Sequence, residues 1–423
     1  MTHPTRSPGH RGDGPNVEDV HLSDLLDEHP TPLVAYSARR LRERVDELRS
    51  AFGPRTRIMF SYKACYLPGV LSVLHGAGID AEVCSGNEYS LALALGLPPE
   101  RITWNAVALD DSEVALALRN PPGCLGLNTL QDIAKVGHAA RGAGRSLDVA
   151  LRIHPAKISS NYLKRGQRLG FDVTDGSALQ AVRQVLDSSR LRLAGFHSHT
   201  QVRQATPERL VDSLRSSVLF CAEVQRATGY TAGFVGIGGG LAGHRALEQA
   251  GARVKDFAVA FQQVLEEEAF PVQLALEPGR FLVDDAAIGI TRVLSRTAAA
   301  GSEWWIVDLG TQFLVPFEGR EFEVEAAWPT DSPRRTVSIG DRLSSYSGVI
   351  KREAQLPEAP PGDLLTVRDV GAYTASTVQR FMYGMPEIVL VDGARTQVQW
   401  RPERPEDWVR QVLAAGDFSD WPK

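Results

Sequence analysis

The chain has 423 residues, of which 43% are hydrophobic and 23% are charged, and its formal net charge is -5. This length and composition predict a globular protein of about two domains. The sequence contains no basic cluster of the kind that indicates nucleic-acid binding, and no apolar stretch reaches the length of a membrane span. The four cysteines lack CxxC or Cys/His metal spacing, so we expect free thiols and a cytoplasmic protein.

The N-terminal residues are rich in Pro, Gly, His and Arg and contain no apolar run of the kind found in signal peptides. We therefore expect residues 1–30 to form a disordered or extended segment.

Residues 31–285 alternate between short apolar runs and amphipathic stretches. Alternating strands and helices predict a parallel sheet, and about eight repeats favour a closed (β/α)8, TIM-type barrel in the α/β class. The expected strands are Pro32–Tyr36, Arg57–Tyr62, Asp80–Cys84, Ile102–Trp104, Leu125–Leu127, Asp148–Ile153, Leu193–His197, Phe234–Ile237 and Val272–Leu276. The expected helices include Arg39–Ala51, Glu88–Leu95, Leu130–Arg141, Leu179–Ser188 and Pro207–Thr228.

Beyond residue 285 the apolar runs are separated by turns rich in Gly, Pro and Asp, with little helix between them. This pattern predicts a second, mostly antiparallel β domain over residues 286–423. Its expected strands are Ile288–Val293, Trp304–Val307, Arg335–Ile339, Leu364–Val367 and Glu387–Val391.

Lys63 stands at the end of the apolar run Arg57–Tyr62. A lysine at the end of a buried strand is costly unless its charge is paired or neutralised. Such a lysine shifts its protonation readily and suits Schiff-base chemistry. The alternative is a lysine that only pairs with an acid or extends to solvent.

A glycine-rich segment, Gly236–Gly243, follows a predicted strand. Glycines let the backbone approach a ligand closely and turn its N–H groups toward a phosphate. Gly238, Gly240 and Gly243 also match the GxGxxG dinucleotide pattern, but the βαβ unit that this pattern requires is not evident. A tight turn of the barrel is the structural alternative.

Three further segments follow predicted strands. Glu277-Pro278-Gly279-Arg280 places a carboxylate at the functional face of a barrel, beside an arginine suited to phosphate; a buried Glu–Arg ion pair is the alternative. His197 and His199 have the i, i+2 spacing of a shared site, so a metal pair, a ring stacked on a flat ligand and a core histidine all remain open. Tyr373 could donate a hydrogen bond to a phosphate.

Together these motifs resemble the fold-type III pyridoxal phosphate (PLP) enzymes, with a barrel of the alanine racemase type, and most closely the diaminopimelate/ornithine decarboxylase family. The resemblance covers about residues 30–395. Phe60-Ser61-Tyr62-Lys63-Ala64 is similar to the family motif Tyr-Ala-x-Lys-Ala, whose lysine forms a Schiff base with the cofactor.

The resemblance implies a role for each matched residue. His199 would stack on the cofactor ring, and Glu277 would pair with the pyridinium nitrogen. Arg152 matches an arginine near the cofactor. The expected phosphate-binding residues are Gly238, Gly239, Gly240, Gly279, Arg280 and Tyr373. The family also forms homodimers with active sites shared across the interface, so we expect a homodimer here.

Two departures from the family lie in the segment Gly340–Ser345. The cysteine that reprotonates the decarboxylated carbon is replaced by Leu343, and the adjacent substrate-binding carboxylate by Ser344. In the family this segment reaches into the partner's site, so Arg342, Leu343 and Ser344 are candidate substrate residues. The PLP motifs are retained, whereas the substrate motifs are changed.

The resemblance therefore implies a PLP-dependent decarboxylase, a carbon–carbon lyase, in which Lys63 and His199 are the catalytic candidates. The substrate would be an amino acid or a carrier-linked aminoacyl group of specialised metabolism, and diaminopimelate is not expected. Lys63 or His199 would supply the proton that the family cysteine gives. The alternatives are an amino-acid racemase or epimerase, a decarboxylation-dependent transaminase, and a non-catalytic PLP-binding protein; a metal-dependent barrel hydrolase is a more distant one.

Overall fold

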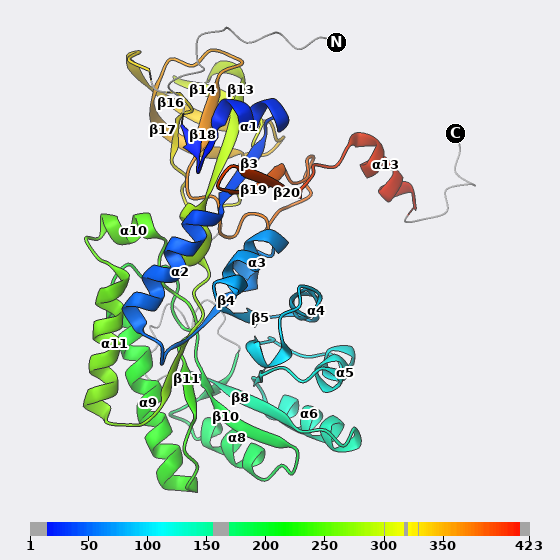
Figure 1. Cartoon of the computed structure of the whole chain (residues 1–423), viewed down its shortest axis with the longest axis vertical. Helices are drawn as coiled ribbons and strands as arrows, with labels where there is room; N and C mark the ends of the chain where they lie inside the picture. Colours follow the sequence, from blue (N-terminus) through cyan, green and yellow to red (C-terminus); the bar gives the residue numbers. More distant parts are fainter. Residues whose placement is uncertain (1–14, 155–168, 300, 317–319, 329, 415–423) are drawn as a thin grey trace. The chain divides into compact units, whose positions relative to one another are not determined.

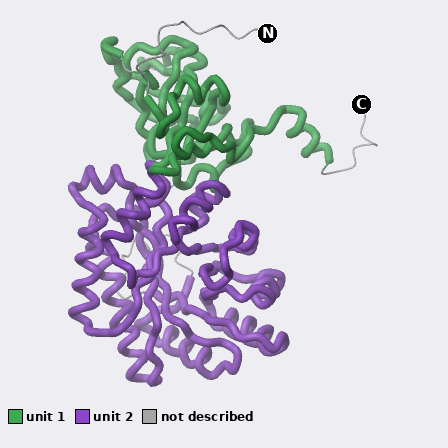
Figure 2. Tube along the Cα trace, viewed as in Figure 1, with its two compact units in different colours: residues 1–39, 286–423 green, residues 40–285 purple. Residues whose placement is uncertain are grey.

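A computed structural model describes residues 15–154, 169–299, 301–316, 320–328 and 330–414. The described chain divides into two compact units (Figure 2). One unit spans residues 40–285, and the other combines residues 15–39 with the chain from residue 286 onward.

Eight parallel strands of the described chain close a barrel in the unit of residues 40–285 (Figure 1). The ring closes because β12 pairs with β4 and β8 pairs with β10, which confirms the predicted (β/α)8 barrel. A short strand, β9 (Phe171–Asp172), extends the sheet beside β8. The barrel strands are β4 (Arg57–Ser61), β5 (Asp80–Val83), β6 (Ile102–Trp104), β7 (Cys124–Leu127), β8 (Leu147–His154), β10 (Leu191–His197), β11 (Phe234–Gly236) and β12 (Gln273–Leu276).

Helices connect successive barrel strands, and their sequences explain where they begin. Capping boxes start α5 at Asp110 and α6 at Thr129, where each side chain accepts a hydrogen bond from an otherwise unpaired N–H group. The helices are α2 (Ala38–Phe52), α3 (Pro68–Gly76), α4 (Gly86–Ala94), α5 (Asp111–Arg119), α6 (Leu130–Gly142), α8 (Ser177–Leu186), α9 (Glu208–Thr228), α10 (His244–Gln249), α11 (Val254–Glu268) and α12 (Arg280–Val283), with 3-10 turns at Tyr62–Ala64, Pro99–Arg101 and Asp284–Ala286.

The second unit is built on a mostly antiparallel sheet, as predicted for the C-terminal part of the chain. Two of its pairings, β14 with β16 and β3 with β19, are parallel. The elements from residue 286 onward are β13 (Ala287–Ala299), β14 (Ser302–Val307), β15 (Val324–Ala326), β16 (Arg334–Asp341), β17 (Val349–Pro357), β18 (Leu364–Val367), β19 (Glu387–Asp392), β20 (Arg395–Trp400) and α13 (Pro405–Ala414).

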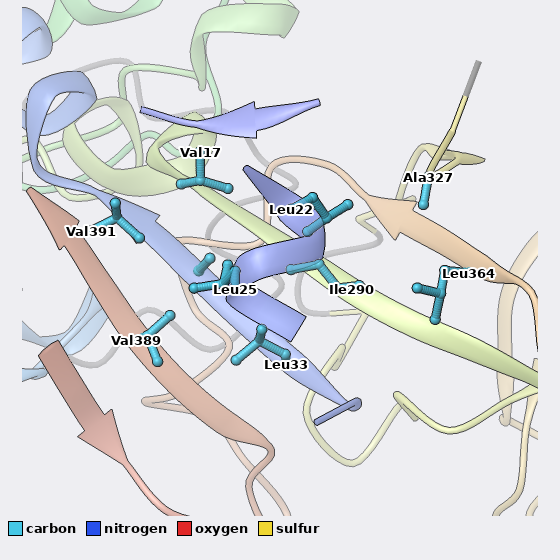
Figure 3. Close-up of a cluster of buried hydrophobic side chains, with 10 residues drawn as sticks. Val17, Leu22, Leu25, Leu33, Ile290, Ala327, Leu364, Val389 and Val391 are labelled. Atoms are coloured by element: carbon cyan, nitrogen blue, oxygen red, sulfur yellow. The ribbon is translucent and has the colours of Figure 1, made fainter. Parts of the chain in front are cut away.

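The N-terminal part of the chain differs from the expectation. Residues 16–28 form β1 (Asn16–Val17), β2 (Val20–His21) and α1 (Leu22–Glu28), whereas a disordered or extended segment was expected over residues 1–30. These elements are ordered because their apolar side chains enter a buried cluster of the β unit (Figure 3). The cluster contains Val17, Leu22, Leu25, Leu33, Ala35, Ile290, Ala327, Leu364, Val389 and Val391.

The first expected barrel strand also belongs to the β unit. The run Pro32–Tyr36 forms β3 (Leu33–Ser37), which pairs with β13 and β19 and not with a barrel strand. The run is apolar and precedes a helix, so its local pattern is that of a barrel strand. Only its pairing with β13 and β19 distinguishes it from a barrel strand.

No helix in the described ranges is long and apolar enough to cross a membrane. Because the eight barrel strands are parallel, their carboxyl ends meet at one rim, where barrel enzymes place their active sites.

Candidate active site

Lys63 lies in the 3-10 turn Tyr62–Ala64, directly after β4. Its side chain is 36% exposed, and its Nζ lies 2.6 Å from Oε2 of Glu82, which is almost fully buried. The lysine therefore keeps one side open to solvent or a ligand while its charge is paired within the barrel.

Glu82 stands beside Ser61 in the register between β5 and β4. The Ser61 hydroxyl donates to Oε2 of Glu82 at 2.7 Å, and the Cys84 thiol donates to Oε1 at 3.1 Å. Burial alone would raise the pKa of Glu82, but the Lys63 charge and the hydrogen bonds of its three donors lower it to about 2. Glu82 is therefore a carboxylate at neutral pH.

His199 follows β10 and has a neutral ring. The Gly239 N–H group donates to its Nδ1 at 3.2 Å, and the Arg152 Nη2 donates to its main-chain carbonyl at 3.4 Å. Burial, followed by the charges of Lys63, Arg152 and His197, lowers the pKa of His199 to about 3. A neutral imidazole whose Nδ1 accepts a hydrogen bond carries its proton on Nε2.

The glycine turn packs tightly against this histidine and against the end of β12. Gly238 has φ +69° and Gly240 has φ +95°, a backbone region that glycine adopts readily. A Cβ at Gly238 would lie 2.4 Å from Nδ1 of His199, and one at Gly239 would lie 2.6 Å from the carbonyl of Glu277. Larger side chains would therefore collide with the site at both positions.

Glu277 follows β12 and is 3% exposed. Nε2 of His197 lies 3.0 Å from its Oε2, and Nδ2 of Asn105 donates to its Oε1 at 2.9 Å. Its N–H group donates to the carbonyl of Gly238 at 2.9 Å, which joins the carboxylate to the glycine turn. Within the described ranges, the His, Cys, Asp and Glu side chains form no group of three that could hold a metal ion.

Gly279 precedes the short helix α12, which begins with Arg280. Arg280 is 7% exposed, and its Nη1 lies 3.8 Å from Oδ1 of Asp284. A Cβ on Gly243 would lie 2.6 Å from Oδ2 of the same Asp284, so the end of α12 lies next to the end of the glycine turn.

The family model described as "Pyridoxal-dependent decarboxylase, pyridoxal binding domain" matches residues 38–284, which is more than half of the chain. The chain belongs to the pyridoxal-dependent decarboxylase family. Its cofactor is PLP, and it is a carbon–carbon lyase of the amino acid decarboxylase class.

Relatives of this decarboxylase family match almost the whole chain. The diaminopimelate decarboxylase of Bacillus subtilis is 26% identical over 407 residues, covering 92% of this chain and 93% of the relative. Among solved structures, diaminopimelate decarboxylase from M. jannaschii has a TM-score of 0.88 at 22% identity, covering 93% of this chain and 94% of that one. A lysine/ornithine decarboxylase from Vibrio vulnificus, complexed with putrescine, has a TM-score of 0.74 at 17% identity, covering 88% and 96%.

The barrel rim of this decarboxylase fits PLP. It offers a partly exposed lysine amine, a buried carboxylate and a glycine turn that only small residues can form. In addition, Oδ1 of Asn105 and Oγ of Ser198 are buried and have no hydrogen-bond partner in the described part of the chain. Buried polar atoms normally have hydrogen-bond partners. The lack of a partner for these two atoms is therefore consistent with a polar ligand at this rim.

The remaining predicted residues lie in the β unit. Tyr373 has φ +53°, and its carbonyl accepts a hydrogen bond from Thr377 at 2.7 Å. The loop after β16 contains Arg342, Leu343 and Ser344. The Arg342 guanidinium lies 3.8 Å from the ring centre of Tyr383.

No function was predicted from the sequence for Ser61, Glu82, Cys84 or Asn105. A signal existed for Glu82 and Asn105, because polar residues at the carboxyl ends of barrel strands face the functional rim. The strands β5 and β6 at which they lie are short, however, and no sequence motif distinguishes the positions of Glu82 and Asn105 from positions that face solvent. The pair His197 and His199 was recognised, but its partners lie on other strands.

Proposed function

We propose that the protein decarboxylates an amino acid or an amino-acid-derived substrate other than diaminopimelate, including aminoacyl groups linked to a carrier. The observation that carries the proposal is the Lys63–Glu82 pair at 2.6 Å, on the same rim as the buried Glu277 carboxylate and the glycine turn. The full-length similarity to diaminopimelate decarboxylases supports the reaction class.

Each residue has a defined task in this proposal. Lys63 would bind the aldehyde of the cofactor, and the carboxylate of Glu277 would stabilise a protonated ring nitrogen. The residues that would hold the phosphate are Gly238, Gly239, Gly240, Gly279, Arg280 and Tyr373, and Arg152 would contribute positive charge. When bound, PLP supplies an electron sink for the electron pair left at Cα as carbon dioxide departs. His197 and Asn105 hold the Glu277 carboxylate in one orientation.

The structure favours Lys63 over His199 as the proton donor to the substrate Cα. His199 is neutral at physiological pH, because its pKa is lowered to about 3. A neutral imidazole is a poor acid. Lys63 has the carboxylate of Glu82 beside it, which stabilises an ammonium on Nζ. His199 remains suited to stacking on a flat ring.

The loop after β16 supports a changed substrate. Asp341 is buried, and its carboxylate already accepts hydrogen bonds from the N–H and hydroxyl of Thr311 and the N–H of Leu343. These contacts hold Asp341 within the β unit, which disfavours it as a replacement for the substrate-binding carboxylate whose position Ser344 occupies. A substrate without a distal ammonium group fits this loop better than diaminopimelate does.

The proposal is tested by incubating the PLP-loaded protein in deuterated water with a panel of amino acids and carrier-linked aminoacyl groups. We expect carbon dioxide release and an amine with one deuteron at Cα. Deuterated amino acid without carbon dioxide would indicate a racemase. A ketone or aldehyde with pyridoxamine phosphate would indicate decarboxylation-dependent transamination. Either outcome would contradict the proposed decarboxylase.

A further inference from the structure

Three donors surround the Glu82 carboxylate, and two of them have no role in the proposed reaction. Lys63 and Ser61 donate to Oε2 at 2.6 and 2.7 Å, and Cys84 donates to Oε1 at 3.1 Å. The Ser61 hydroxyl oxygen and the Cys84 sulfur also lie 3.4 and 3.5 Å from Nζ of Lys63. Ser61 and Cys84 therefore each contact both the Glu82 carboxylate and the Lys63 amine.

Cys84 acts here as a donor, not as a thiolate. Burial, followed by the charge of Glu82, raises the pKa of the Cys84 thiol well above its usual range. The thiol keeps its proton and can donate it only to a nearby acceptor, and Oε1 of Glu82 is that acceptor. Ser61 stands where the family motif has alanine, so its hydroxyl is an addition at this position.

An ion pair in a protein interior is stable only when further hydrogen bonds satisfy its remaining lone pairs. Without them the proton can move from the amine to the carboxylate, which leaves a neutral amine beside a neutral acid. Donors on both oxygens of Glu82 oppose that transfer, because they stabilise the carboxylate and not the protonated acid.

We propose that Ser61 and Cys84 are positioning residues that keep the Lys63–Glu82 pair charged. In the cofactor-free protein, Lys63 is then an ammonium ion that must release a proton to solvent before its lone pair attacks an aldehyde. The C–N bond forms after that step, and one water molecule leaves. The inference shares with the proposed function only the identity of Lys63 as the cofactor lysine.

Other charged or titratable groups also face this pair. Glu88, from helix α4, and His199, which follows strand β10, each interact electrostatically with both Lys63 and Glu82. Arg152, from strand β8, and His197, at the end of strand β10, act on His199. Burial, opposed by a hydrogen bond from the Cys84 N–H group, raises the pKa of Glu88. Substitutions of Ser61 and Cys84 leave all of these side chains in place. Because the Ser61 hydroxyl also lies 3.2 Å from the main-chain carbonyl of Glu277, C84A, which leaves that contact intact, isolates the loss of a donor to Glu82.

The experiment measures how fast the full-length, cofactor-free protein attaches PLP, from the rise of visible absorption over a series of pH values. Borohydride reduction and peptide mapping confirm attachment at Lys63. We expect S61A and C84A each to shift the pH–rate profile to lower pH, with attachment about three- to tenfold faster at neutral pH. The double variant should shift further, and C84S, whose hydroxyl can donate, should resemble the wild type.

Two further variants control for general effects. Cys221→Ala removes a buried thiol from α9 and should leave the profile unchanged. Glu82→Gln removes the charge itself and should give at least about a tenfold increase at neutral pH. A double variant whose profile coincides with that of the wild type, or moves to higher pH, would overturn the proposal. Because no substrate is present, this outcome is independent of whether the protein decarboxylates anything.

Discussion

At the scale of single residues, the chemistry depends on what each ionisable group contacts. The same barrel rim holds Glu82, whose strongest partner is the Lys63 ammonium, and Glu277, whose partners are His197 and Asn105. One carboxylate thus lies beside the reactive amine, whereas the partners of the other among the described residues are an amide and an imidazole, which suits it to a cationic ring nitrogen.

Replacing Glu277 with glutamine tests the second role. The amide keeps the size of the side chain and its hydrogen bond to Asn105, but it cannot carry the charge that stabilises a protonated ring nitrogen. We expect carbon dioxide release to fall by about a hundredfold or more, while the visible absorption of bound PLP persists. Steady-state turnover and the absorption spectrum measure the two effects, and full activity in Glu277→Gln would contradict the assigned role.

His199 predicts a defined pH response. Its pKa is about 3 in the folded protein, against an ordinary value of 6.5, so the unfolded chain takes up this proton first as the pH falls. His199 therefore contributes a loss of stability as the pH falls from about 6.5 toward 3, and none above that window.

Histidine-selective NMR checks this directly. The signal that disappears in His199→Asn identifies the residue, and in the wild type it should stay constant between about pH 5 and 8. A midpoint near the ordinary histidine value would mean that the ring is solvated and charged under acidic conditions. That result would restore His199 as a candidate proton donor.

At the scale of elements, the glycine turn offers a matched pair of substitutions. Gly238 and Gly251 both have positive φ, +69° and +65°, but only Gly238 has an atom of the site within reach of an added Cβ. Alanine at either position costs about 1 kcal/mol of backbone strain. We expect Gly238→Ala to weaken PLP binding by about tenfold or more and Gly251→Ala to leave it unchanged, as measured by absorption titration. Equal affinities would show that the turn does not bind the cofactor.

The sequence predicted elements best where local pattern and final packing agree. β6 and β18 have the expected bounds, Ile102–Trp104 and Leu364–Val367, because each is a short, wholly buried apolar run. The strands β17 and β20 were missed, because they lie at the ends of the strand order and carry many exposed polar residues. β3 was placed in the wrong unit because its local sequence does not indicate which strands it pairs with.

Only those residues of the candidate site that lie within recognisable motifs could be predicted from the sequence. Lys63, His199 and Glu277 lie in short motifs directly after strands, so the sequence placed them at one rim. Glu82 and Asn105 could not be found in this way, because their contacts join residues 19 and 172 positions apart in the sequence. A single sequence contains no information on that pairing until the barrel register is known.

At the scale of the whole molecule, the family resemblance predicts a homodimer. Light scattering coupled to size-exclusion chromatography should give twice the mass of the chain, with and without PLP. The active site would then include residues from both chains, so dilution below the dimer dissociation constant should abolish turnover. A monomer with full activity would contradict shared sites.

The central claim, that this is a PLP enzyme acting through Lys63, is tested most directly by the absorption spectrum of the protein with PLP, before and after borohydride. We predict a visible band that reduction abolishes, with the cofactor mapped to Lys63, and no such band in Lys63→Ala. Lys135→Ala, which removes a surface ion pair with Asp111, should behave as the wild type does. A wild-type protein that takes up no PLP, or a label on another lysine, would contradict the account.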